Sequence, residues 1–313
     1  MAELSKEKFQ IIGCNDLDAE RIVRPNITYW QDAWRRLKKN KVAMVSLVVL
    51  GVIAIMTVFG PMMSQYGFAD QDIKITNKPP FGNHWFGTDN LGRDIFVRLW
   101  KGGRISLAIG LLGTLIEVVV GCLWGGIAGY FGGLVDDIMM RIVEIIVSVP
   151  YMIVVVLITV FFKSMNDGKG IGGIAPLLIA LCITGWTGIS RMIRGQVMQL
   201  KESEYVLAAH ALGASSGRII LKHLIPNTIG VIIVYISLDI PSFIFAEAFL
   251  SFVGLGVEPP NTSWGAMSAL GQQQFTFYPH ELLFPAVAIS LTMLAFNLLG
   301  DGLRDALDPK LRQ

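Results

Sequence analysis

Residues 204–227 read EYVLAAHALGASSGRIILKHLIPN, a polar and helix-prone block between two long apolar segments. The part before Gly213 contains neither Gly nor Pro and is rich in Ala and Leu, which favours a short helix. Gly213 fits the end of that helix, because a left-handed cap residue is usually Gly. Ser215 or Ser216 can cap a second helix, which Pro226 is expected to end. The block therefore predicts two short helices joined by a hinge.

The segments on either side of this block are apolar enough to cross a membrane. Of the 313 residues, 53% are hydrophobic and 16% are charged, and the mean hydropathy is +0.55. A run of about 20 apolar residues spans a bilayer. Such runs predict six spans, at residues 42–63, 105–130, 138–162, 174–189, 229–253 and 282–299. We therefore expect an all-α membrane protein with six transmembrane helices.

The spans divide the chain into an anchor and a core. We expect a cytoplasmic N-terminal tail, a first anchor helix, an extracytoplasmic loop, a core transmembrane domain and a cytoplasmic C-terminal tail, at residues 1–41, 42–63, 64–104, 105–303 and 304–313. The inside loop at residues 200–227 contains the block. The polar N-terminal tail includes Glu3 and Asp16 and does not fit a secretory signal, so the first span is expected to stay as an anchor.

The distribution of basic residues orients these spans. Of the 26 lysines and arginines, 18 fall in segments expected inside and eight in segments expected outside. Cytoplasmic loops carry the excess of basic residues, so both termini and the 204–227 block are expected in the cytoplasm. The first outside loop is an exception that the sequence does not explain. Its basic residues are Lys74, Lys78, Arg93, Arg98, Lys101 and Arg104.

Several function classes are excluded by composition and motif spacing. A net charge of +2 is too small to indicate nucleic-acid binding. The glycine-rich stretch at residues 168–173 lacks the spacing of a phosphate-binding loop, and Phe284 stands where an HExxH motif starting at His280 would place its second histidine. The three cysteines are far apart and fit small apolar filler. We expect no catalytic residue, no metal and no cofactor, so any ATP must be bound by another subunit.

Acidic residues within the apolar spans are the remaining candidate site residues. Charge inside a membrane is expensive and tends to face a cavity or a partner. Asp239 and Glu247 are therefore candidates for a translocation path, and Pro241 close to Asp239 favours a kink there. Glu144 lies three residues after Arg141 on one helix face, so a structural pair is the simpler interpretation.

Four segments of the sequence carry a resemblance. Ala208, Ala209 and Gly213 follow the spacing AA-x-x-x-G, and Pro226 lies thirteen residues after Gly213. This pattern resembles the EAA motif of permease subunits in ABC transporters of the type I importer kind. The form EYVLAAHALGAS resembles the oligopeptide and dipeptide branch of that family. Further matches to this branch are HWFGTDNLGRDIFVRL at 84–99, FLSFVGLGVEPPNTSWGAM at 249–267 and GDGLRDALDPKLR at 300–312.

Two residues depart from the bare motif. Glu204 precedes Ala208 by four positions instead of being adjacent to the alanines, and His223 stands where an apolar residue is usual. The rest of the pattern still implies the C-type permease subunit of this importer family, with the type I fold and a cytoplasmic coupling helix. The implied ATPase-coupling residues are Glu204, Ala208, Ala209, Gly213, Arg218, Lys222 and Pro226.

The resemblance also implies partners and a location. These are a second homologous permease subunit, two ATP-binding subunits and an extracytoplasmic substrate-binding protein, assembled in the cytoplasmic membrane of a prokaryote. The expected function is translocation of oligopeptides or dipeptides, with ATP hydrolysed by the separate subunits and no enzymatic activity in this chain. Such a multi-pass membrane protein contacts lipid and is not expected to bind nucleic acid.

Three alternatives stay open at this point. The same family imports nickel and other small solutes, although few His and Cys residues in the spans argue against nickel. An ion-coupled secondary transporter would use Asp239 and Glu247 as ion or proton sites. The 204–227 block by itself also fits an ordinary amphipathic segment on the membrane surface.

Overall fold

The computed structural model describes residues 28–165, 175–257 and 259–308, and within these ranges the protein is helical and contains no β-strand. The expectations for residues 1–27 and for the turn at 168–173 fall outside the described residues. The α-helices are α1 Tyr29–Lys39, α2 Lys41–Phe59, α3 Ile95–Phe131, α4 Gly133–Ser148, α5 Tyr151–Met165, α6 Ala175–Leu200, α7 Glu204–Ala211, α8 Ser216–Arg218, α9 Ile225–Asn227, α10 Ile229–Phe252, α11 Trp264–Gln274 and α12 Pro279–Leu307. Short 3-10 helices cover Gly60–Met62 and Ile73–Ile75, and a π-helical segment covers Ile219–Leu224.

Six spans can be counted among these helices. The helices α2, α3, α6, α10 and α12 are each long and apolar enough to cross a membrane. The pair α4 and α5 passes the same test together but is bent by 80° at its break. Pro150 lies in this break, and proline cannot donate the backbone hydrogen bond that a continuous helix needs. The described helices therefore give five spans, or the expected six when this bent pair counts as one, and the span expected at 138–162 is broken rather than straight.

The helix α3 is packed at the centre of the bundle, and it touches α6 through glycines. A Cβ added at Gly121 would lie 2.2 Å from Ile189 Cγ2, and one at Gly125 would lie 2.2 Å from the carbonyl oxygen of Ser190. Such short distances leave no space for a side chain, so the two backbones approach closely, as is common between membrane helices. The many glycines of this span therefore have a packing role.

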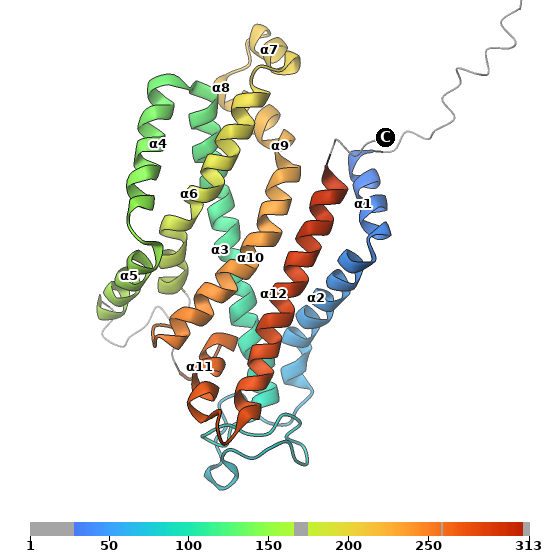
Figure 1. Ribbon diagram of the computed structural model, residues 1–313, viewed down its shortest axis with the longest axis vertical. Coiled ribbons are helices and arrows are strands. Elements are labelled where there is room, and N and C mark those ends of the chain that lie inside the picture. The colour runs from blue at the N-terminus through green and yellow to red at the C-terminus, as the bar shows by residue number, and fades with distance from the viewer. Residues whose placement is uncertain (1–27, 166–174, 258, 309–313) are drawn as a thin grey trace, which may run out of the picture.

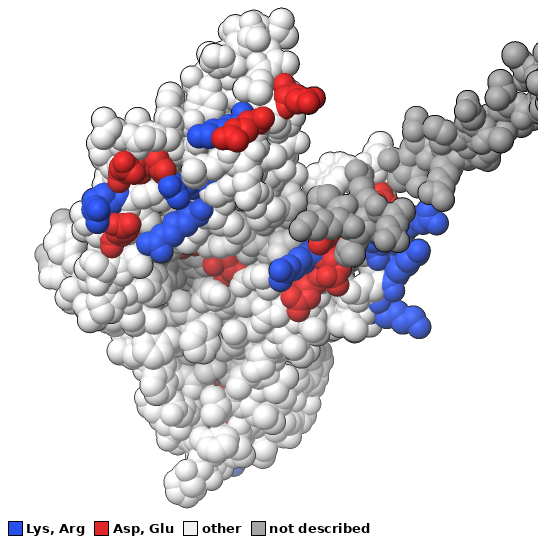
Figure 2. All heavy atoms as spheres, turned by 45° about the horizontal axis from the view of Figure 1, so that its top comes forward, with Lys and Arg blue, Asp and Glu red and all other residues white. Residues whose placement is uncertain are grey.

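The two ends of the bundle differ in character. Figure 1 places α7, α1 and the C-terminal end of α12 at one end, and α11 and the folded loop before α3 at the other. Charged side chains gather around the α7 end in Figure 2, while the flank below it is almost free of them. An uncharged flank between polar ends is the pattern that a bilayer requires.

Several helices extend further than the apolar runs suggested. The 37 residues of α3 correspond to a length of about 55 Å, which exceeds the ~30 Å of a bilayer core. The loop expected at 64–104 therefore ends at Asp94, which caps α3, and α6 runs on to Leu200 instead of ending near 189. Hydropathy does not detect these extensions, because the parts of a helix that leave the membrane are polar.

Two regions expected outside the spans contain helices. In the tail expected at 1–41, α1 starts with a capping box formed by Thr28 and Gln31, and its residue Leu37 is buried. The hydroxyl of Tyr29 donates to the carbonyl oxygen of Leu307 at 3.2 Å, so α1 is attached to the end of α12. The outside loop expected between the last two spans contains α11, which packs against α10 and α12.

Two of the basic residues counted in the first outside loop have structural partners. Arg104 donates from Nε to the carbonyl oxygen of Thr57 at 2.6 Å and from Nη2 to that of Val58 at 2.7 Å. These carbonyls lie at the C-terminal end of α2, where a cation is favourable. The Nζ atom of Lys101 lies 5.2 Å from the centre of the Phe68 ring. These contacts account for part of a cluster that the sequence left unexplained.

Candidate functional site

The 204–227 block projects from the same end of the bundle as α1 and is attached there by α7. Glu204 lies in the first turn of α7, where a negative charge is favoured by the helix dipole. Val206 is the buried residue of this helix, and it belongs to an apolar cluster with Ile193, Ile219 and Leu224. One side chain therefore fixes α7 to the end of α6 and to the second half of the block.

The backbone after α7 forms a Schellman cap around Gly213. The amide of Ala214 donates to the carbonyl oxygen of Ala209 at 3.0 Å, and the amide of Gly213 donates to that of His210 at 2.9 Å. Gly213 has a φ of 81°, in the left-handed region that favours glycine. The predicted cap at Gly213 is therefore present, and it sets the angle at which the chain leaves α7.

Part of the exposed surface of α7 and of the residue after its end is apolar and has no partner within the described residues. Leu207 is 58% exposed and Leu212 is 89% exposed, and Tyr205 and Ala208 beside them are also exposed. We call these four residues the apolar tip. Large exposed apolar groups on a small helix indicate a surface that another protein covers. The arrangement offers a docking surface and no catalytic group.

Most of the predicted coupling residues lie on the surface of this block. The exposed ones are Glu204, Ala208, Gly213, Arg218, Lys222 and Pro226. Ala209 is half-buried, so a partner can reach only part of it. The sequence did not single out Leu207 or Leu212, although their spacing beside the alanines was visible.

The second half of the block differs from the expected single helix ended by Pro226. Helical backbone runs through α8, the π-helical segment Ile219–Leu224 and α9, so Pro226 lies inside the last turn. The amide of Ile225 donates to the carbonyl oxygen of Ile220, five residues earlier. Because Pro226 has no N–H, a wide turn before it costs fewer hydrogen bonds than elsewhere. Only Thr228 separates Asn227 from the start of α10.

An ion pair that the sequence did not reveal stabilises this end of the bundle. Arg194 of α6 binds both carboxylate oxygens of Asp136 on α4, through Nε and Nη2. Two parallel hydrogen bonds make this geometry specific. The expected pair of Arg141 and Glu144 is also present at 2.8 Å, but both side chains are exposed, so it contributes little to stability.

The predicted path residue Asp239 meets a second carboxyl group. The carboxyl group of Asp239 on α10 lies next to that of Glu117 on α3. Gly185 of α6 provides the space for this contact, because a Cβ there would lie 1.3 Å from Oε1 of Glu117. Asp239 is partly exposed, and its Oδ2 atom has no hydrogen-bond partner within the described residues.

The predicted path residue Glu247 has a different environment. It is fully buried, and its carboxyl group accepts hydrogen bonds from Ser263 at 2.6 Å, Ser251 at 2.7 Å and Ser106 at 3.2 Å. Ser263 is the N-cap residue of α11, Ser251 lies in α10, and Ser106 lies in α3. The geometry favours a role in joining these three elements, since buried polar groups are stable only when hydrogen-bonded.

Comparisons with known proteins agree with this arrangement. Residues 121–313 match the family described as "Binding-protein-dependent transport system inner membrane component", and residues 28–80 match "N-terminal TM domain of oligopeptide transport permease C". The oligopeptide transport system permease protein OppC of Bacillus subtilis is 46% identical over the full length of both chains. The dipeptide transport system permease protein DppC of the same organism is 50% identical over 95% of this chain and 90% of its own.

A solved structure shows the same fold. The inward-facing MetNI methionine ABC transporter contains a chain that superposes with a TM-score of 0.53 at 19% identity. The match covers 67% of this chain and 96% of that chain.

Proposed function

This chain belongs to the family of binding-protein-dependent transport system inner membrane components, and from that membership we propose that it imports oligopeptides or dipeptides in an ATP-driven complex. The family is one of multi-pass inner-membrane permeases that work with ATP-binding subunits and a substrate-binding protein. The peptide cargo is supported by two relatives, named for oligopeptide and dipeptide transport, that align over nearly the whole chain.

The observation that carries the coupling role is the apolar tip on the Schellman-capped helix α7. The movement that ATP hydrolysis drives in separate subunits has to reach the permease. The permease therefore needs a rigid cytoplasmic element that these subunits can bind. In this proposal a groove on an ATP-binding subunit covers the apolar tip, while Glu204, Arg218 and Lys222 form contacts at its polar edge. Val206 and the cap at Gly213 then transmit movement of α7 to the bundle.

The proposed assembly contains one second homologous permease, two ATP-binding subunits and one extracytoplasmic binding protein. We propose that both termini are cytoplasmic, because this orientation puts 18 of the 26 basic residues on the cytoplasmic side. We retain the division into anchor, outside loop, core and tails as part of the proposal, with helix α1 inside the expected tail and α3 beginning inside the expected loop.

We assign Asp239 to the translocation path together with Glu117. Their contact lies between α3 and α10, and Asp239 retains an unpartnered carboxyl oxygen. A carboxyl pair of this kind can meet the ammonium group of a peptide as it passes. For Glu247 the serine contacts support a positioning role at the outer end of α10 rather than contact with cargo.

The proposal is tested by peptide uptake into proteoliposomes that contain the complete importer. Uptake of a dipeptide should require ATP, both kinds of permease and the binding protein. Nickel uptake without competition by peptide would overturn the cargo assignment. Peptide uptake driven by an ion gradient in the absence of the ATP-binding subunits would overturn the importer class.

A further inference from the structure

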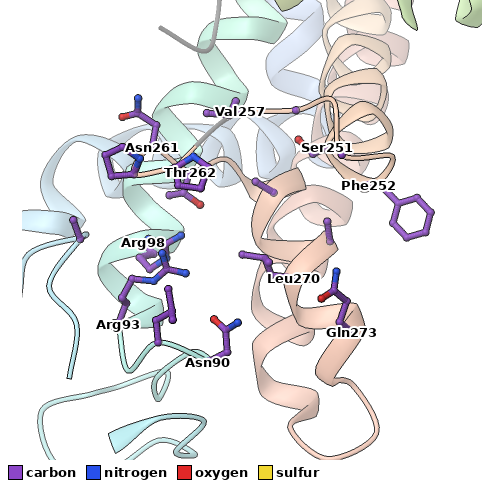
Figure 3. Close-up of a pocket in the computed structure, with 18 of the residues that line it drawn as sticks. Asn90, Arg93, Arg98, Ser251, Phe252, Val257, Asn261, Thr262, Leu270 and Gln273 are labelled. Atoms are coloured by element: carbon purple, nitrogen blue, oxygen red, sulfur yellow. The ribbon is translucent and has the colours of Figure 1, made fainter. Parts of the chain in front are cut away.

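A pocket of about 610 Å³ lies at the end of the bundle opposite α7. Its walls come from three segments: the loop before α3 together with the first turn of α3, the connection after α10, and α11. Ligand pockets typically occupy ~300–1,000 Å³, so this one has the size of a small-molecule site. In Figure 3, Arg93 and Arg98 lie on one side of the space, and Leu270 and Gln273 lie on the other.

Two buried arginines in this pocket share one carboxylate. The Nε atom of Arg93 lies 2.7 Å from Oδ2 of Asp89, and the Nε atom of Arg98 lies 3.4 Å from the same oxygen. Arg98 also donates from Nη1 to the carbonyl oxygen of Phe68 at 3.0 Å. Three guanidinium nitrogens have no hydrogen-bond partner among the described residues: Nη1 and Nη2 of Arg93, and Nη2 of Arg98. The N–H donors on these nitrogens are therefore available to a ligand in the pocket.

The inner surface of the pocket carries an excess of positive charge from the two arginines. Asp94 is paired with His84 at 2.7 Å and caps α3, so it is not available to them. Glu281 lies near Asp89, and neither residue lines the pocket. Among the described lining residues the two arginines are the charged ones. A planar carboxylate is one of the anions whose geometry matches a guanidinium group.

The rest of the lining suits a peptide. Amide side chains of Asn90, Asn261 and Gln273 can donate to and accept from backbone groups, and Leu91 and Leu270 provide apolar surface. A single acidic side chain from a docked protein would leave most of a 610 Å³ space unfilled. We propose that this outer pocket binds a peptide through its C-terminal carboxylate, held by Arg93 and Arg98. This inference rests on the proposed peptide cargo.

The test compares a free acid with an amide of the same peptide. Trialanine and trialanine amide are taken up separately by proteoliposomes that contain the complete importer and its binding protein. The ratio of the two uptake rates is compared between variants, so that any preference of the binding protein cancels. Arg93→Gln is expected to lower this ratio by about tenfold, the effect of one charge-assisted hydrogen bond, with little change for the amide.

Matched variants control for charge and folding. Lys74→Gln removes an exposed positive charge from the same loop outside the pocket, and the ratio should not change. Gln273→Glu alters an exposed residue of α11, so folding is preserved, and the new carboxylate should repel the free acid but not the amide. Glu258→Gln removes the acidic residue of the connection after α10 and should leave the ratio as in the wild type.

Each other result would overturn the inference. An equal loss for acid and amide in Arg93→Gln would assign the arginines to folding. The same equal loss with weaker binding of the unliganded binding protein would assign the pocket to docking. A ratio that rises in Glu258→Gln would show that the chain's own carboxylate competes for the arginines. If the wild type takes up neither peptide, the proposed function itself fails, which is a separate outcome.

Discussion

The cap at Gly213 allows a sharp test of how α7 is held. Gly213 has a φ of 81°, and a Cβ built there meets nothing within 4 Å. In Gly213→Ala the cost is therefore conformational and comes without a clash, at about 1–2 kcal/mol for a left-handed alanine. Gly217 also has open space around its Cβ position but has no positive φ, so Gly217→Ala is a matched control.

A cost of about 1–2 kcal/mol makes local opening of the cap roughly 5–30 times more frequent. Hydrogen exchange of the Ala214 and Gly213 amides, which bond to Ala209 and His210, should accelerate by that factor. Peptide-stimulated ATPase activity of the reconstituted complex should fall with it, and Gly213→Asn should retain more activity because Asn tolerates this conformation. Unchanged exchange in Gly213→Ala, or an equal loss in Gly217→Ala, would refute the reasoning.

Three further variants test other parts of the structure. Val206→Ala should destabilise the attachment of α7 by about 2 kcal/mol and speed the hydrogen exchange of its amides. Leu207→Asp, on the exposed side of α7, should leave this hydrogen exchange unchanged but weaken co-purification of the ATP-binding subunit. Gly125→Leu should abolish accumulation in the membrane on an immunoblot because its Cβ would lie 2.2 Å from Ser190 O, whereas Gly51→Leu, with open space, should accumulate normally. Glu247→Leu should lower stability by about 3 kcal/mol in thermal unfolding by leaving serine hydroxyls unpaired, and Glu247→Gln should lose less. A destabilised Leu207→Asp, a normal level of Gly125→Leu or an unchanged midpoint for Glu247→Leu would each contradict the corresponding contact.

Much of the architecture follows from local features of the sequence. Apolar runs of roughly the length that a bilayer requires predict the number of spans, because the backbone of a single segment in lipid can pair its polar groups internally only as a helix. The short helix before Gly213 and its cap could also be predicted, since propensity and the left-handed preference of glycine act within a few residues. The surface position of most coupling candidates followed from the polarity of the block itself.

Other features were decided only by contacts between distant parts of the chain. Asp239 and Glu247 are both acidic residues in one apolar helix, and composition alone gave them the same interpretation. The tertiary structure separates them: Glu117 on α3 faces Asp239, whereas Glu247 accepts from Ser106, which lies 141 residues away in sequence. The roles of arginines in the first outside loop likewise depend on their tertiary contacts with Asp89, with Thr57 and with the pocket beside α11.

The chain by itself therefore predicted a helical membrane protein of six spans, of which five or six are found, and an exposed helical block between two of them. Hydropathy and backbone preference are properties of consecutive residues, so they can be read in order. Which buried carboxyl group is satisfied, and which guanidinium group has donors to spare, depends on side chains brought together by packing. Those distances exist only once α3, α10 and α11 are in place.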